Sequence, residues 1–65
     1  MRTFTVIDDA TGDGCEFRAL DLGAAMLAAD TWMREREWPE GQVEVGYQLV
    51  DDRGVHYHCR ARVAT

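Results

Sequence analysis

Only one segment of this sequence, Asp21 to Trp38, has apolar residues at a sustained helical spacing. The apolar positions recur at intervals of three and four residues, which places them along one face of an α-helix. This stripe consists of Leu22, Ala25, Met26, Ala29, Trp32, Met33 and Arg36, of which all but the last are expected to face the core. Asp21 is placed to cap the first turn, and Pro39 ends the helix because it disfavours helical geometry at Trp38. The remaining segments are short, so this single helix has to cover a sheet.

Two alternating segments before the helix predict a pair of half-buried strands. The first runs from Phe4 to Asp8. It places Phe4 and Val6 on one face and Thr3, Thr5 and Ile7 on the other. The second alternates Cys15, Phe17 and Ala19 with Glu16 and Arg18. The intervening residues, Asp9 to Gly14, have the composition of a turn, so we expect the two strands to pair.

Asp51-Asp52-Arg53-Gly54 is the strongest local signal in the chain. It suits a three-residue hairpin loop, in which a type I turn is closed by Gly54 in the left-handed region. This loop sets Asp51 opposite Val55 and determines how the strand Gln42 to Val50 pairs with the next strand. The apolar face then pairs Leu49 with Tyr57, Tyr47 with Cys59, Val45 with Ala61 and Val43 with Val63. The polar face pairs Val50 with His56, Gln48 with His58, Gly46 with Arg60 and Glu44 with Arg62.

A slip of one residue would expose the whole apolar set, so the hydrophobic pattern and the turn chemistry predict the same register. The predicted fold is α+β, a single domain over residues 1–65 with the order β-β-α-β-β. It consists of a four-stranded antiparallel sheet with one helix packed on one face. The other face is left open, which antiparallel sheets tolerate.

The open face holds the first group of candidate partner-binding residues. His56, His58, Arg60 and Arg62 line one strand, with Glu44 and Gln48 opposite them and the Thr3, Thr5 and Ile7 face close by. Stacked imidazole and guanidinium groups suit an acidic or aromatic partner, whereas the alternative is a solvated sheet face. His56 and His58 also have a geometry that metals use, but a zinc site needs three or four ligands and no third ligand is evident.

The acidic turns and the helix end form a second candidate surface. Asp8, Asp9, Asp13, Asp51, Asp52, Glu35, Glu37 and Glu40 fall at the two hairpin tips and at the end of the helix. If two of these groups converge, they could imitate a nucleic-acid backbone or dock an arginine-rich protein; otherwise they are ordinary solvated turns. Trp38 is a further candidate, because it either folds back or forms an exposed apolar patch with Leu27.

Enzymatic and cofactor-binding functions are not expected. The chain has no serine, and Cys15 and Cys59 both occupy predicted core positions, where cysteines are usually inert. Asp9, Thr11, Asp13 and Gly14 match part of a calcium-loop pattern, but its final glutamate is replaced by Leu20. The expected site therefore contains no catalytic group, cofactor or metal.

Composition limits the partners further. The net charge is −5, which argues against binding to a duplex phosphate backbone as a primary role. All seven cationic side chains are arginines, which either serve specific bidentate contacts or reflect a GC-rich coding genome. The longest apolar run, Ala24 to Ala29, is far shorter than the roughly 20 residues that span a bilayer. The residues after Met1 lack the apolar core of a signal peptide, so we expect a cytoplasmic protein with reduced thiols. A core of this size rarely contributes more than about 3–5 kcal/mol, and a homodimer therefore stays an alternative.

The chain resembles small proteins encoded by phages and mobile elements, including some anti-CRISPR proteins. The resemblance lies in the run Glu16-Phe17-Arg18-Ala19-Leu20-Asp21-Leu22, the following Ala25 and Ala29, and the hairpin Val50-Asp51-Asp52-Arg53-Gly54-Val55. It implies a protein that binds a host nuclease complex and blocks its nucleic-acid path, but it carries over no functional residue. HicB-type antitoxins are similar in running strands into an alanine-rich helix, although their Gly-Cys segment before the helix is missing here.

The sequence therefore predicts a small, acidic, non-enzymatic protein-binding module that inhibits a nucleic-acid-targeting complex of a host. A regulatory or antitoxin-like homodimer is the alternative, and a metal-dependent binder that uses His56 and His58 is a third reading.

Overall fold

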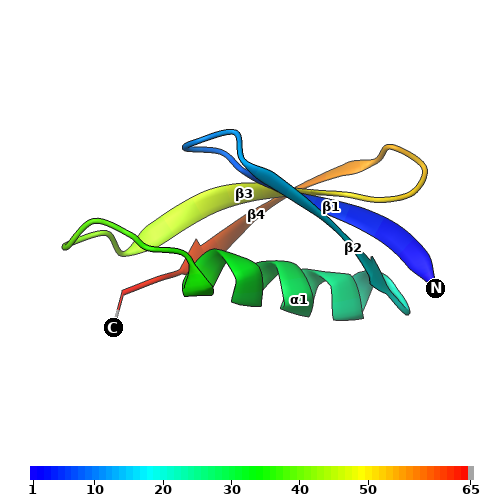
Figure 1. Cartoon of the computed structure of the whole chain (residues 1–65), viewed down its shortest axis with the longest axis horizontal. Helices are drawn as coiled ribbons and strands as arrows, with labels where there is room; N and C mark the ends of the chain where they lie inside the picture. The colour runs from blue at the N-terminus through cyan, green and yellow to red at the C-terminus, as the bar shows by residue number, and fades with distance from the viewer. Residues whose placement is uncertain (65) are drawn as a thin grey trace.

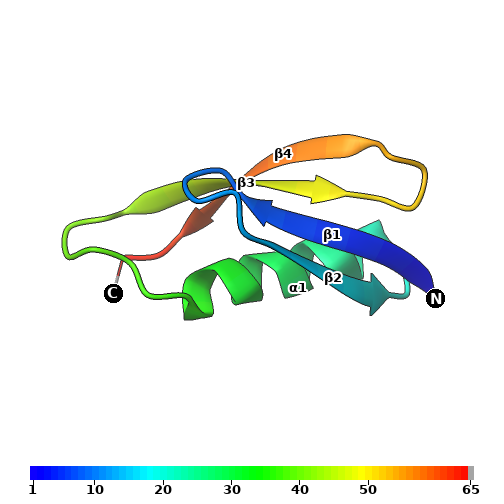
Figure 2. The same cartoon turned by 45° about the horizontal axis from the view of Figure 1, so that its top comes forward.

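Four antiparallel strands form a twisted sheet, and one helix lies against one of its faces (Figure 1). The computed structural model describes residues 1–64. The elements in chain order are β1 (Arg2–Asp8), β2 (Gly14–Ala19), α1 (Leu22–Glu35), β3 (Glu44–Val50) and β4 (His56–Arg62). The strands lie side by side in the order β2-β1-β3-β4, so β2 and β4 form the two edges of the sheet (Figure 2). The predicted α+β architecture and element order are confirmed.

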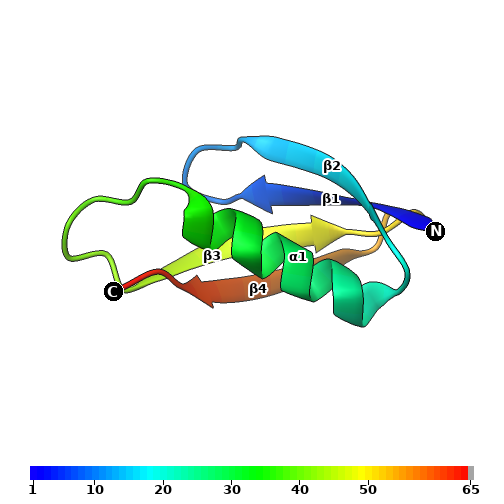
Figure 3. The same cartoon turned by 60° about the horizontal axis from the view of Figure 1, so that its bottom comes forward.

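The core forms where the apolar faces of the strands meet the apolar stripe of α1. The buried apolar residues are Phe4, Val6, Ala19, Ala25, Ala29, Met33, Val45, Tyr47, Leu49 and Ala61. The helix contacts all four strands, crossing them diagonally (Figure 3). Its buried residues, Ala25, Ala29 and Met33, are four positions apart. A row of side chains at this spacing is inclined to the helix axis, so it can follow the surface of a twisted sheet. Leu22 and Trp32 pack at the margin of this core. Met26 falls beside this row of side chains and is 39% exposed, so its predicted place in the core is wrong.

The start of α1 agrees with the sequence prediction, but its end does not. Asp21 Oδ1 accepts a hydrogen bond of 2.8 Å from the amide of Ala24, as expected of an N-cap. The helix ends at Glu35 instead of Trp38, because Arg36 adopts extended backbone angles (φ −74°, ψ 156°). Trp38 folds back and its indole Nε1 donates to the carbonyl of Met33 at 2.7 Å. The same carbonyl accepts from the amide of Arg36 at 3.3 Å, so the indole adds a second hydrogen bond at the helix end.

The β3–β4 hairpin has the predicted register. Its pairs run from Val50 with His56 to Glu44 with Arg62. The amide of Gly54 donates to the carbonyl of Asp51 at 3.1 Å, and Gly54 has a φ of +82°. Glycine adopts this left-handed conformation without a steric penalty, which is why the three-residue loop can close here.

Packing is weaker at the margins of the sheet than the sequence pattern predicts. Val43 was expected on the core face, yet it lies before β3, lines a hollow and is 48% exposed. It still pairs with Val63, whose amide donates to the Val43 carbonyl at 2.9 Å. Tyr57 and Cys59 are only half-buried because β4 is an edge strand with a neighbour on one side.

Two methionines of α1 provide a matched test of this packing. Met33 is fully buried, so we expect Met33→Ala to reduce the free energy of unfolding by about 2–5 kcal/mol. That loss is comparable to the whole stability of about 3–5 kcal/mol expected for a domain of this size, so much of the variant should be unfolded at room temperature. Met26→Ala removes the same atoms from an exposed position and should change stability by no more than about 0.5 kcal/mol. Urea unfolding followed by circular dichroism measures both values; equal losses would contradict the diagonal placement of α1.

Candidate functional site

The face of the sheet opposite α1 is open and is built from the polar positions of all four strands (Figure 2). Pairing across the strands arranges these positions in rows. One row joins Glu16, Thr5, Val50 and His56, and the next joins Gly14, Ile7, Gln48 and His58. Arg60 and Arg62 continue the surface along β4, opposite Gly46 and Glu44. We call this surface the open face. It brings together the candidates that the sequence placed on it, with the β1 residues beside them.

The outer strand of the open face carries four basic side chains in succession. His56, His58, Arg60 and Arg62 are all exposed and all point to the same side of the sheet; we call them the basic row. At about 3.4 Å per residue, the row is about 20 Å long. Among residues 1–64 no carboxylate forms an ion pair with any member, although Glu44 lies directly across from Arg62. The basic row is therefore available to an anionic group from outside the chain.

A hydrogen-bonded network crosses the open face and orients one histidine. Gln48 Nε2 donates to Asp9 Oδ1 at 3.3 Å, which turns Gln48 Oε1 toward His56. This oxygen lies 2.8 Å from His56 Nδ1, so Nδ1 carries a hydrogen and donates it. The other ring nitrogen, Nε2, is left for a partner.

The sequence pattern did not place Asp9 on the open face. The signal that could have found it is Gly46, because a glycine inside a strand often marks the close approach of another group. A Cβ atom at Gly46 would lie 2.8 Å from Asp9 Oδ2. The carboxylate of Asp9 thus occupies the space of a side chain at this position, next to Arg60.

Asp51, a candidate partner-binding residue, is only 8% exposed and shapes the turn instead. Its Oδ1 accepts from the amides of Arg53 and Val55, both at 2.9 Å. Its Oδ2 accepts from the hydroxyl of Tyr57 at 3.4 Å and lies 3.6 Å from an Arg2 nitrogen. The hydrogen bond from the Val55 amide is the main cause that lowers the pKa of Asp51 below its usual value.

Asp52 stands at the surface beside this turn. It is exposed and accepts a hydrogen bond of 3.2 Å from Arg2. The acidic groups of the two hairpins do not converge, since the β3–β4 turn and the β1–β2 loop lie at opposite ends of the sheet (Figure 1). The β1–β2 loop instead meets the end of the helix, because Arg36 bonds to Asp13 at 2.8 Å. This contact lowers the pKa of Asp13.

Asp8 is fully buried, although its position at a hairpin tip suggested a solvated carboxylate. Its Oδ1 accepts from the amide of Ala10 at 2.8 Å. Its Oδ2 lies 3.3 Å from Arg36 Nε, close enough for an ion pair but without hydrogen-bond geometry. Asp8 therefore contributes to structure and not to an exposed acidic surface.

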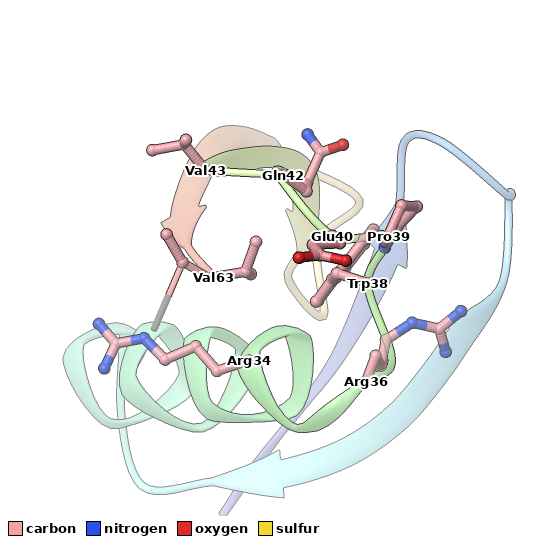
Figure 4. A pocket seen from close by; sticks show the side chains of 10 residues that line it. Arg34, Arg36, Trp38, Pro39, Glu40, Gln42, Val43 and Val63 are labelled. Carbon is pink, nitrogen blue, oxygen red and sulfur yellow. The ribbon is translucent and has the colours of Figure 1, made fainter.

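Trp38, the remaining candidate, lies at the end of the molecule where α1, the following loop and the end of β4 meet. It is half-buried and packs against the core, so it does not share an exposed patch with Leu27. A hollow of about 500 Å³ opens beside it (Figure 4). The hollow is lined by Arg34, Arg36, Trp38, Pro39, Glu40, Gly41, Gln42, Val43, Val63 and Ala64. Among the described residues that line it, Glu40 is the only one with a carboxylate side chain, and the guanidinium of Arg36 points away toward Asp13.

Within residues 1–64, no three metal-ligating side chains lie close enough together to hold a metal ion. Cys15 and Cys59 are free thiols on the two opposite edge strands. Burial, with the nearby Cys59 thiol, raises the pKa of Tyr47 to about 12, so its hydroxyl stays neutral at physiological pH. No helix in the described part of the chain is long and apolar enough to cross a membrane.

Comparisons of the chain with protein-family models, curated proteins and solved structures found no match. The function has to be inferred from the residues and their geometry.

The lowered pKa of Asp51 predicts a specific acid sensitivity. The ionised carboxylate stabilises the fold above its ordinary pKa of 3.8, and this stability is lost as the pH falls through the lower pKa of the folded state. We expect Asp51→Asn to be less stable than the wild type at pH 6 and to show a flatter decline between pH 4 and pH 2. Asp52→Asn is the control, since its single contact to Arg2 is exposed. Urea midpoints measured across this range give the slopes; identical slopes for all three proteins would contradict the role of Asp51.

Proposed function

We propose that this chain is a non-enzymatic protein-binding module that docks an acidic partner through the open face of its sheet. The observation that carries the proposal is the basic row, whose charge is opposite to the net charge of −5. The core lies on the other face, so folding does not require these side chains. Electrostatic complementarity of this kind speeds association and selects the partner. His56, held by Gln48 and Asp9, would add a directed hydrogen bond.

The biological role that we attach to this module is inhibition of a host nucleic-acid-targeting complex by a phage or mobile-element protein. The resemblance of the strand-to-helix and hairpin segments to anti-CRISPR proteins supports this role. The exposed carboxylates of Glu37 and Glu40 lie in the loop that follows α1 and would suit the cationic nucleic-acid path of such a complex. The two free thiols are in keeping with the cytoplasm as its compartment.

Replacing all four members of the basic row by threonine tests the proposal. We expect the variant to keep its fold, because the side chains are exposed and threonine favours strands. It should lose capture of nuclease-complex subunits from a bacterial lysate, measured by mass spectrometry. The matched control, Arg34→Thr with Arg53→Thr, also removes two arginines but from the helix and the turn, and it should retain capture. Equal capture by both variants, or an unfolded basic-row variant, would contradict the proposal.

A regulatory or antitoxin-like homodimer is the second candidate, because the solvent side of α1 carries an apolar patch. Leu27 is 72% exposed and borders a shallow hollow of about 450 Å³ with Ala24, Ala28 and Trp32. Exposed apolar patches of this kind often mark protein contacts.

Sedimentation equilibrium at micromolar concentration distinguishes the two candidates. The leading proposal predicts a single species of 7.4 kDa. A species of twice that mass that dissociates on Leu27→Glu would favour the homodimer, whereas Met26→Glu on the flank of the helix serves as the control.

A further inference from the structure

The basic row lies on an edge strand, so it coincides with a line of unpaired backbone groups. β4 pairs with β3 on one side, and no other strand of residues 1–64 pairs with its outer side. An edge strand offers its outward N–H and C=O groups to any extended chain that can lie beside it.

The hydrogen bonds of the hairpin show which residues of β4 offer these groups. The amide of Asp51 donates to the carbonyl of Val55 at 3.0 Å, and that of Val63 donates to Val43 at 2.9 Å. In an antiparallel pair, hydrogen-bonded residue pairs alternate with pairs whose N–H and C=O groups point outward. Counting from either end, Tyr57, Cys59 and Ala61 bond to β3.

The four residues between and around them therefore direct their backbone groups to the free edge. These are His56, His58, Arg60 and Arg62. An independent hydrogen bond agrees, since the carbonyl of Gly46, the partner of Arg60, accepts from the amide of Asp9, the residue after β1, and not from β4. The same four residues thus present basic side chains to the open face and unpaired backbone groups to the edge.

The charge of this edge decides what can pair with it. In a β4–β4 contact between two copies, antiparallel pairing about Cys59 would set His58 opposite Arg60 and His56 opposite Arg62. In that register neither Arg60 nor Arg62 meets a carboxylate, so a second copy would leave both guanidinium charges unpaired and is a poor occupant. A strand with carboxylates at alternate positions would place each one opposite a basic side chain.

The other edge strand, β2, does not combine outward backbone groups with a row of basic side chains. β2 has six residues, and its open-face positions are Gly14, Glu16 and Arg18, which have no charge in common. Strand addition with charge selection is therefore a property of β4.

We propose that an extended acidic segment of the partner protein adds to β4 as a fifth, antiparallel strand. The added residues opposite the basic row direct both their carboxylates to the open face and their amides to β4. This inference rests on the proposed protein-binding function and names the chemistry of the partner.

A designed peptide tests the proposal directly. The probe is a capped, fluorescently labelled nine-residue peptide in which threonine and glutamate alternate, with threonine at both ends. Because the glutamates pair with the basic row, their N–H groups face β4, whereas those of the threonines face solvent. We expect N-methylation of the two central glutamates to weaken binding at least tenfold. N-methylation of two interior threonines should leave the dissociation constant within about twofold, because it removes no donor to β4.

A variant of the protein tests the same edge from the other side. Proline is tolerated in an edge strand where its missing N–H faces solvent, so His58→Pro should retain the fold while weakening peptide binding at least tenfold. Fluorescence anisotropy gives the affinities, and circular dichroism reports the fold. If His58→Pro fails to fold, the comparison of the two methylated peptides still decides the question.

The outcomes separate this inference from the proposed function. If the threonine variant of the basic row binds the unmethylated peptide as tightly as the wild type, the open face is not the binding surface and both proposals fail. If that variant loses binding but the two methylated peptides bind equally, the face binds acidic chains without strand addition, and only the present inference fails. Equal binding of a thymidine oligonucleotide, or self-association through β4, would also overturn it. Failure of the unmethylated peptide to bind would mean that the basic row serves only to keep the edge from aggregating.

Discussion

The register of the β3–β4 hairpin is the constraint on which the rest of the molecule depends. Asp51 holds the turn through two amide hydrogen bonds, and Gly54 closes it in a conformation that other residues rarely adopt. Because side chains alternate with a period of two, this one register assigns Leu49 and Tyr47 to the core and the basic row to the open face. It also assigns the outward backbone groups of β4. A slip of one residue would destroy core, binding face and edge together, so stability and function are specified by the same turn.

A second constraint fastens the helix to the first hairpin. Arg36 lies 3.3 Å from the buried carboxylate of Asp8 and 2.8 Å from Asp13, and its guanidinium packs 4.6 Å from the ring centre of Trp32. A buried carboxylate without a cation nearby is costly, so this arginine has to reach inward. Extended backbone at Arg36 allows that reach, and the helix stops one residue before it. The loop that follows can then return Trp38 to the end of α1.

Local patterns in the sequence were enough to predict the strands, the order of elements and the hairpin register, because each of them depends on residues close together in the chain. The end of α1 was not predictable in this way, since it is set by the contact of Arg36 with Asp8, 28 residues earlier. The network of Asp9 with Gln48 was missed for a related reason, because it requires β1 to lie beside β3. Strand order of this kind leaves no periodic signal. The exposure of Met26 likewise reflects the diagonal path of α1 across a twisted sheet, which a helical stripe alone does not encode.

The acidic side chain at the turn end of the basic row limits where an acidic strand can bind. The row ends at the turn that carries Asp52, while its other end lies opposite Glu44. An acidic strand that extended past the turn end would bring its carboxylates beside Asp52, and like charges placed this close disfavour that alignment. About 20 Å of basic edge accommodates roughly four acidic side chains on one face of an added strand. A net negative charge elsewhere on the chain is therefore no obstacle to binding an acidic partner, because it restricts that partner to the one strand that carries the basic row.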